Sequence, residues 1–247
     1  MFPSTQPTEH VSLMHLSEFG RRQGAGGRGA DTVAGGTQLS ALNPTLVQDL
    51  QRFDRGAAAG ASPGATLDML EVLAAALRHG RALLLHLQID QRVLPLTVRP
   101  SERQVQSPLA LNQLLALRLP DLRVLRVEPA RDGGDPALAD TGAPLVTEPL
   151  GPLLWELALR GARDALLPEI GGVAAYRVAP GAELQGLELT GTLAAAVARL
   201  HRQTTPLREI AAWPGFDRDR AVRLLNALYL QAALMVSRTH PAAISPG

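Results

Sequence analysis

The chain has 247 residues, 46% of them hydrophobic and 19% charged, which are the proportions of a globular protein. Its formal net charge is only +1. This excludes strong attraction to nucleic acid or to anionic membranes through overall charge alone. It has no cysteine, which excludes a disulfide framework, a thiolate nucleophile and a zinc–thiolate site.

All 24 basic residues are arginines. Together with the abundance of alanine, glycine, proline and leucine, this composition is typical of a GC-rich genome, and we expect a bacterial source. Residues 1–10 lack the basic and apolar regions of a signal peptide. The sequence contains no run of about 18 apolar residues, so we expect a cytoplasmic protein without membrane contact.

Residues 1–65 are predicted to form a flexible N-terminal region with short helical segments. Stretches rich in glycine at 20–38 and 56–64 have the composition of linkers. Between them, a short helix is expected within 39–53, after Asn43-Pro44.

Residues 66–180 are predicted to form a mixed α/β domain. Thr66 is placed to cap a helix that ends at Gly80. Two extended runs then lie on either side of Asp90-Gln91-Arg92 and predict a β-hairpin, in which Pro95 must lie on an edge or at a bulge.

The second half of this domain also alternates between helix and strand. A helix over 108–119 precedes a strand over 122–128, whose apolar and charged residues alternate. The stretch 129–148, rich in Pro, Gly and Asp, is expected to be a surface loop or a boundary. A helix over 150–167 and a strand over 173–178 follow. This order predicts a small mixed sheet with helices on one face, and an α+β fold class for the chain.

Motifs for catalysis or metal binding are missing from the sequence. The six histidines show no metal-ligand spacing such as HExxH, and no GxSxG nucleophile elbow is present. Asp132, Asp135 and Asp140 cluster without the spacing of an EF-hand, so solvated carboxylates are expected there. We therefore predict no enzymatic activity, no metal and no cofactor. A site assembled in space from distant residues is the remaining alternative.

The stretch 205–238 has the most specific pattern, and it lies within a predicted third domain, 181–247. Thr205 is placed to cap a first short helix and Pro206 to take its first position. Pro214-Gly215 ends that helix, and Asp217 begins a longer one whose apolar residues recur at helical spacing. A short run resembling a strand follows.

Small residues mark the turn between these two helices. Ala211 is followed four residues later by Gly215 and then by Phe216, with apolar Ala221 and Leu224 beyond. A small side chain lets two helices cross closely, and glycine permits the turn. Over about residues 190–240 the chain therefore resembles the winged helix-turn-helix superfamily. That resemblance implies either DNA binding or protein–protein contact.

The long helix carries the candidate binding residues. A DNA reader would present Arg218, Arg223 and Asn226, because these side chains suit base edges. Asp217 and Asp219 offset the arginines, and residues 181–247 hold seven arginines against five acidic residues. Because affinity for DNA comes largely from neutralised phosphates, this balance favours a protein contact.

Two further features of this region favour a protein contact. Val222 and Leu230 leave the long helix apolar on more than one side, which indicates burial against another element or a partner. Little chain follows Arg238 to form a basic wing. We predict a non-enzymatic regulatory or adaptor protein that acts through protein–protein contacts or self-association; the alternative is a DNA-binding transcriptional regulator. The binding residues in either case would be Arg218, Arg220, Arg223, Asn226, Val222 and Leu230.

Overall fold

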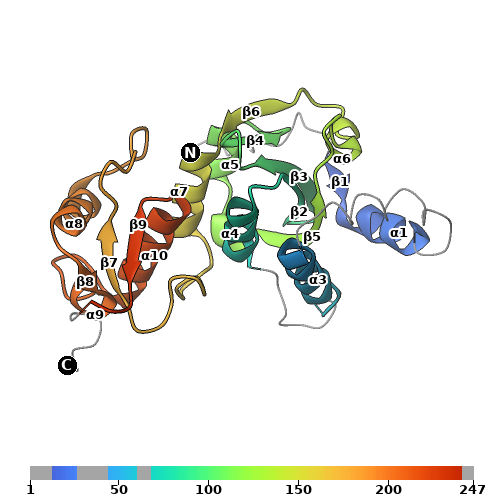
Figure 1. Ribbon diagram of the computed structural model, residues 1–247. Coiled ribbons are helices and arrows are strands. Elements are labelled where there is room, and N and C mark those ends of the chain that lie inside the picture. Colours follow the sequence, from blue (N-terminus) through green and yellow to red (C-terminus); the bar gives the residue numbers. More distant parts are fainter. Residues whose placement is uncertain (1–12, 27–43, 60–67, 241–247) are drawn as a thin grey trace. The chain divides into compact units, whose positions relative to one another are not determined.

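The computed structural model describes residues 13–26, 44–59 and 68–240. The chain is an α+β protein that divides into two compact units, Met1–Leu150 (unit 1) and Gly151–Gly247 (unit 2) (Figure 1). The sequence-based boundary lay near residue 180. The structure differs because the strand at 175–178 pairs with strands of unit 2. The boundary falls instead directly after the stretch 129–148.

Unit 1 is built on an antiparallel sheet. Its strands run in the order β5-β2-β3-β4-β6, and β1 pairs with β3 beside this path. The sheet predicted to be mixed has only antiparallel pairs among the described residues, because short connections join β2, β3 and β4, whereas parallel neighbours need long crossovers. The strands are β1 Met14–His15, β2 Leu83–Ile89, β3 Arg92–Arg99, β4 Gln104–Ser107, β5 Arg123–Pro129 and β6 Val146–Pro149.

The predicted hairpin is confirmed, with Ile89 opposite Arg92 across the turn. Pro95 lies inside β3, yet it interrupts no ladder. The outer edge of β3 pairs with β1 at Arg92 and Val93 and with β4 from Thr97 onward. Pro95 therefore falls in the gap between these two partners, where its missing N–H removes no hydrogen bond of the ladder.

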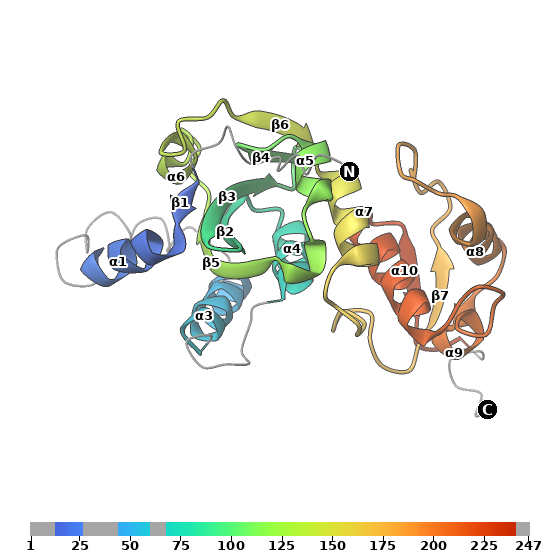
Figure 2. The same cartoon turned by 180° about the vertical axis from the view of Figure 1, so that it is seen from behind.

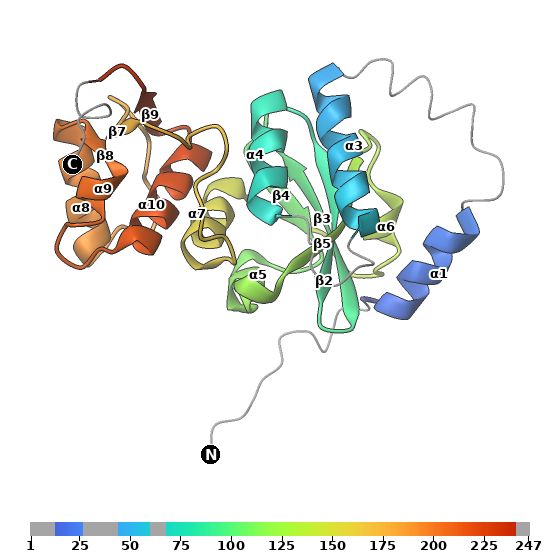
Figure 3. The same ribbon diagram turned by 90° about the horizontal axis from the view of Figure 1, so that it is seen from below.

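One face of the sheet forms the core of unit 1. Because side chains alternate along a strand, Leu83, Leu85 and Leu87 of β2 share this face, and each is 1% exposed or less. Helices α3 (Pro44–Ala59) and α4 (Met69–His79) cover it, and Figure 3 shows both on the same side of the sheet. The predicted helix after Asn43-Pro44 is confirmed and extends further than expected.

The ends of α4 follow from single residues. The Asp68 carboxylate accepts a hydrogen bond from the Leu70 N–H at 2.8 Å, which caps the first turn. Gly80 ends the helix with a φ of +61°, a left-handed conformation that glycine adopts without steric cost. The predicted end is thus confirmed, whereas the predicted cap, Thr66, lies outside the described residues.

Two short helices lie on the other face of the sheet, so the expectation of helices on one face only is wrong. In α1 (Leu16–Gly26), the Phe19 ring lies 5.0 Å from the ring of His86 in β2, centroid to centroid. In α6 (Pro136–Ala139), the preceding Asp135 accepts a hydrogen bond from the Thr97 hydroxyl of β3 at 2.6 Å. The glycine content predicted a linker from residue 20 onward, but α1 continues to Gly26.

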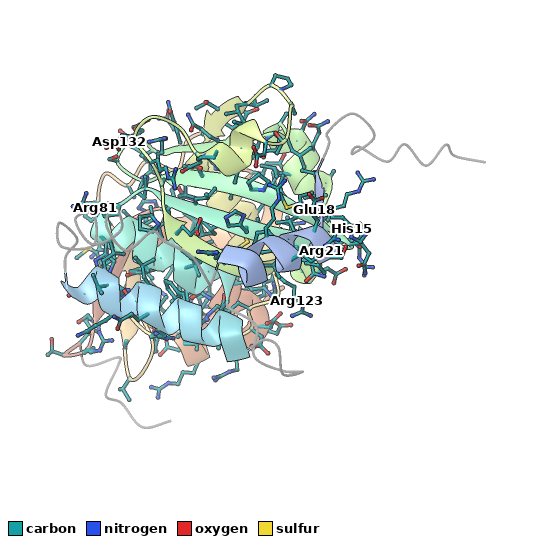
Figure 4. All side chains as sticks on the ribbon, turned by 90° about the vertical axis from the view of Figure 1, so that its right-hand side faces the viewer. His15, Glu18, Arg21, Arg81, Arg123 and Asp132 are labelled. Atoms are coloured by element: carbon teal, nitrogen blue, oxygen red, sulfur yellow. The ribbon has the colours of Figure 1, made fainter. Side chains whose placement is uncertain are left out.

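Antiparallel pairing places charged residues at opposite ends of this sheet (Figure 4). His15, Glu18 and Arg21 lie at the same end as Arg123, which begins β5. Arg81, before β2, and Asp132, after β5, lie at the other end.

Glu128 of β5 interacts with His86 of β2, and the contribution of its carboxyl group to stability depends on pH. A hydrogen bond from His86, at 3.5 Å, lowers the pKa of the Glu128 carboxyl below 4.5; burial opposes this shift, and the neighbouring Arg126 adds to it. A carboxyl whose pKa is lower in the folded state stabilises the fold above its unfolded pKa, and this contribution is lost as pH falls through the folded value.

We therefore expect the difference in melting temperature between wild type and Glu128→Gln to be largest above about pH 5 and to shrink below about pH 4. Thermal unfolding followed by circular dichroism over this range measures it. A difference independent of pH would contradict the pairing. Glu102→Gln, at an exposed position in the same unit, is the control.

The helix predicted over 108–119 is shorter in the structure. It comprises α5 (Leu111–Ala116) and a single 3₁₀ turn, η1 (Leu119–Asp121). The Gln113 side chain accepts a hydrogen bond from the Ala110 N–H at 3.0 Å, which sets the start of α5 beyond Pro108. Pro120 takes an early position in η1, where a missing N–H is tolerated.

Unit 2 combines helices with a three-stranded antiparallel sheet of order β8-β7-β9. Figure 2 shows its middle strand, β7, between α10 and α8. The helix predicted over 150–167 ends at Arg160, and the long helix predicted after Asp217 is confirmed, with the Asp217 carboxylate capping it. The elements are α7 Leu150–Arg160, β7 Ala175–Val178, α8 Gly191–Arg202, β8 Thr205–Pro206, α9 Leu207–Ile210, α10 Arg218–Leu230 and β9 Leu234–Ser237.

The described residues of unit 2 do not confirm a wing. The middle strand of its sheet, β7, precedes the helices in the chain, and β9 pairs with β7. No strand follows β9 among the described residues. Thr205 and Pro206 also differ from their expected roles, because they pair with β7 as β8, and Pro206 takes the N-cap position of α9.

Within the described ranges, no helix is long and apolar enough to cross a membrane, and no three acidic or histidine side chains are grouped to hold a metal ion.

Candidate partner-binding surface

The long helix α10 is buried along most of its length. Val222 and Leu230 are each 1% exposed, and Asn226 is fully buried. These three candidate residues therefore pack inside unit 2 and offer no area to a partner in this fold. The sequence predicted self-association through Val222 and Leu230. These side chains are not exposed, so they cannot form such an interface in this fold.

Two polar side chains join α10 to the end of α7 and to the segment that follows it, and Figure 3 shows α7 and α10 side by side. The Asn226 amide accepts from the Leu167 N–H at 2.9 Å and donates to the Ala165 carbonyl at 3.0 Å. Arg223 donates to the Leu159 and Gly161 carbonyls at 3.1 and 2.8 Å, and its guanidinium pairs with Asp219 at 2.9 Å. Both side chains therefore stabilise the fold of unit 2.

The turn between α9 and α10 approaches α8 closely. Gly215 has a φ of +74°, and a Cβ added there would lie 2.8 Å from the Thr192 Cγ2 of α8. Both the backbone conformation and the lack of space require glycine. The Asp217 carboxylate accepts from the Arg220 N–H at 2.7 Å and starts α10 directly after this turn.

Two aromatic rings and two arginines form a continuous row across this turn, which we call the arginine–aromatic ladder. The Arg199 Cζ of α8 lies 4.6 Å from the centroid of the Trp213 ring. Trp213 and Phe216 meet edge to face at 6.3 Å, and the Arg220 Cζ of α10 lies 5.2 Å from the Phe216 centroid. These separations suit cation–π and aromatic contacts.

Positive charge is in excess around the ladder. Among the described residues, five exposed arginines of α8, α9 and α10 form no ion pair, namely Arg199, Arg202, Arg208, Arg218 and Arg220. The nearby acidic residues are Glu209, Asp217 and Asp219; Asp217 caps α10 and Asp219 pairs with Arg223. The surface can therefore attract an anionic group without first breaking an internal ion pair.

The structure keeps part of the predicted set and adds residues that the sequence did not single out. Arg218 and Arg220 are exposed on the first turn of α10, as a binding surface requires. The added residues are Arg199, Trp213 and Phe216. In a chain with only 3% aromatic residues, two aromatics flanking Pro214-Gly215 were the available signal.

Comparisons with family models, with curated proteins and with solved structures found no match to this chain.

Proposed function

We propose that the protein is a non-enzymatic regulatory or adaptor protein that acts through protein–protein contacts made by unit 2. The arginine–aromatic ladder is the observation that carries the proposal, because it is an ordered surface with unpaired guanidinium groups beside it. Interfaces are enriched in arginine and in large aromatic residues, which combine contact area with directed hydrogen bonds.

A DNA-binding regulator is the second candidate, and the exposed first turn of α10 favours it. The N-terminal residues of a recognition helix contact base edges, and Arg218 and Arg220 occupy this place. The rest of the helix supports the proposal of a protein contact instead. Asn226, the side chain suited to adenine, is buried with both hydrogen bonds made inside unit 2.

Fluorescence anisotropy with random duplex DNA, at low and at moderate salt, separates these two functions. We expect no saturation below about 100 μM protein at about 150 mM salt, which is weaker than nonspecific DNA-binding proteins achieve. Binding that weakens with salt and is lost in the triple variant Arg199→Ala, Arg218→Ala and Arg220→Ala would overturn the proposal in favour of DNA. Arg223 stays unchanged in this variant, because its contacts with carbonyl groups stabilise the fold.

A further inference from the structure

We infer that the arginine–aromatic ladder binds an acidic peptide segment of a protein partner. This inference rests on the proposed function and adds the chemistry of the partner. Its basis is the joint presence of ordered guanidinium groups, unpaired positive charge and aromatic rings that are covered.

The ladder holds its arginines in place before a partner arrives. A guanidinium stacked on a ring has its N–H donors in its own plane, directed away from the ring. For Arg199, which is exposed, the side chain forms no hydrogen bond to a protein acceptor among the described residues, so its donors are not already used within the fold. Arg220 uses one nitrogen, Nη1, to donate to the Gly215 carbonyl at 2.9 Å. A side chain already ordered in this way loses less conformational entropy on binding.

The free donors suit anionic groups that have two adjacent oxygens. A planar guanidinium offers two parallel N–H groups that match two oxygens of a carboxylate or of a phosphate. Arg199 lies on α8 and Arg220 on α10, so the two guanidinium groups belong to different elements joined through the rings. A ligand that uses both therefore needs several anionic groups along one chain, and a run of glutamate or aspartate provides them.

The covered rings make a nucleic acid a poor occupant of this surface. Proteins that bind single strands stack bases on open aromatic faces. Trp213 is only 7% exposed, and Arg199 covers one of its faces. Duplex binding requires many neutralised phosphates, yet seven arginines against five acidic residues in 181–247 leave a balance of only +2. A short acidic segment requires far fewer positive charges.

The test uses the full-length protein and fluorescence anisotropy with three labelled probes. These are a peptide of alternating Glu and Ser, the same peptide with Gln in place of Glu, and a duplex DNA of random sequence. We expect the Glu peptide to bind with a Kd of about 10–100 μM at about 50 mM salt and to weaken as salt rises. The Gln peptide and the DNA should bind at least about tenfold more weakly.

Matched variants connect binding to the ladder. Arg199→Ala with Arg220→Ala should weaken binding of the Glu peptide about tenfold, whereas Arg92→Ala with Arg118→Ala, at exposed positions of unit 1, should not change it. The double variant Arg199→Lys with Arg220→Lys keeps the positive charges but loses the planar guanidinium groups. The logarithm of its Kd for the Glu peptide should therefore rise by about half as much as in the alanine double variant. Unchanged melting temperatures of all variants show that the fold is intact.

Four results would overturn the inference. Equal binding of the Glu and Gln peptides would remove the role of carboxylates, and an equal loss in the unit 1 control would remove the role of the ladder. No binding of either peptide or of the DNA would also overturn the acidic-segment inference, but it would leave the proposed protein contact standing. Tight DNA binding through Arg199 and Arg220 would overturn both proposals.

Discussion

Replacing Asn226 with alanine should lower the free energy of unfolding of unit 2 by about 2–3 kcal/mol. The substitution removes the acceptor of the Leu167 N–H, which is buried. It also removes the donor to the Ala165 carbonyl and leaves a small cavity beside α10. A buried donor left without a partner accounts for most of this cost.

Urea unfolding followed by tryptophan fluorescence measures this loss in unit 2 alone. The chain has two tryptophans, Trp155 and Trp213, and both lie in unit 2. Arg218→Ala is the matched control, because it changes an exposed side chain of the same helix and should alter stability by less than about 0.5 kcal/mol. If Asn226→Ala were as stable as this control yet lost partner binding, Asn226 would be a contact residue, as its sequence position suggests.

Asn226 shows why the candidate surface was only partly predictable. Its sequence context, on a long helix after a turn, is the same for a residue that reads DNA and for one that stabilises a core. The hydrogen bond to Leu167 spans 59 residues, and the bond from Arg223 to Gly161 spans 62. No local pattern records such partners. The periodicity therefore located α10, but it did not show which of its sides would be covered.

Features decided by neighbouring residues were predicted well. The hairpin of β2 and β3, the end of α4 at Gly80 and the start of α10 at Asp217 all depend on residues a few positions apart. The boundary between the units depends on which strands β7 pairs with. Strand pairing between distant segments is a property of the whole fold, so composition and periodicity did not show it.

Of the three aspartates that the sequence analysis expected to be solvated, two are exposed and one is buried through a distant contact. Asp132 and Asp140 are exposed, as expected, whereas Asp135 is 4% exposed. Its carboxylate accepts from the Thr97 hydroxyl at 2.6 Å and from the Arg131 N–H at 2.9 Å. The Thr97 partner lies 38 residues away, in the middle of the sheet, which is why the local sequence did not predict the burial.

Asp135→Ala should therefore destabilise unit 1 by about 2–4 kcal/mol, whereas Asp132→Ala should change its stability by less than about 0.5 kcal/mol. Hydrogen exchange at the Leu96 and Val98 amides of β3 measures the effect locally, because unit 1 has no tryptophan.

A double-mutant cycle with Thr97→Val assigns the cost of Asp135→Ala to a contact. Thr97→Val alone leaves the buried carboxylate without its side-chain donor, and Asp135→Ala alone leaves the buried hydroxyl without its acceptor. The double variant removes both the carboxylate and the hydroxyl, so neither is left buried without its partner. Its loss of unfolding free energy should therefore be smaller than the sum of the two single losses by at least about 1 kcal/mol. Strictly additive costs would mean that each side chain acts through other neighbours. The short distance between the two oxygens would then contribute nothing to holding α6 against the sheet.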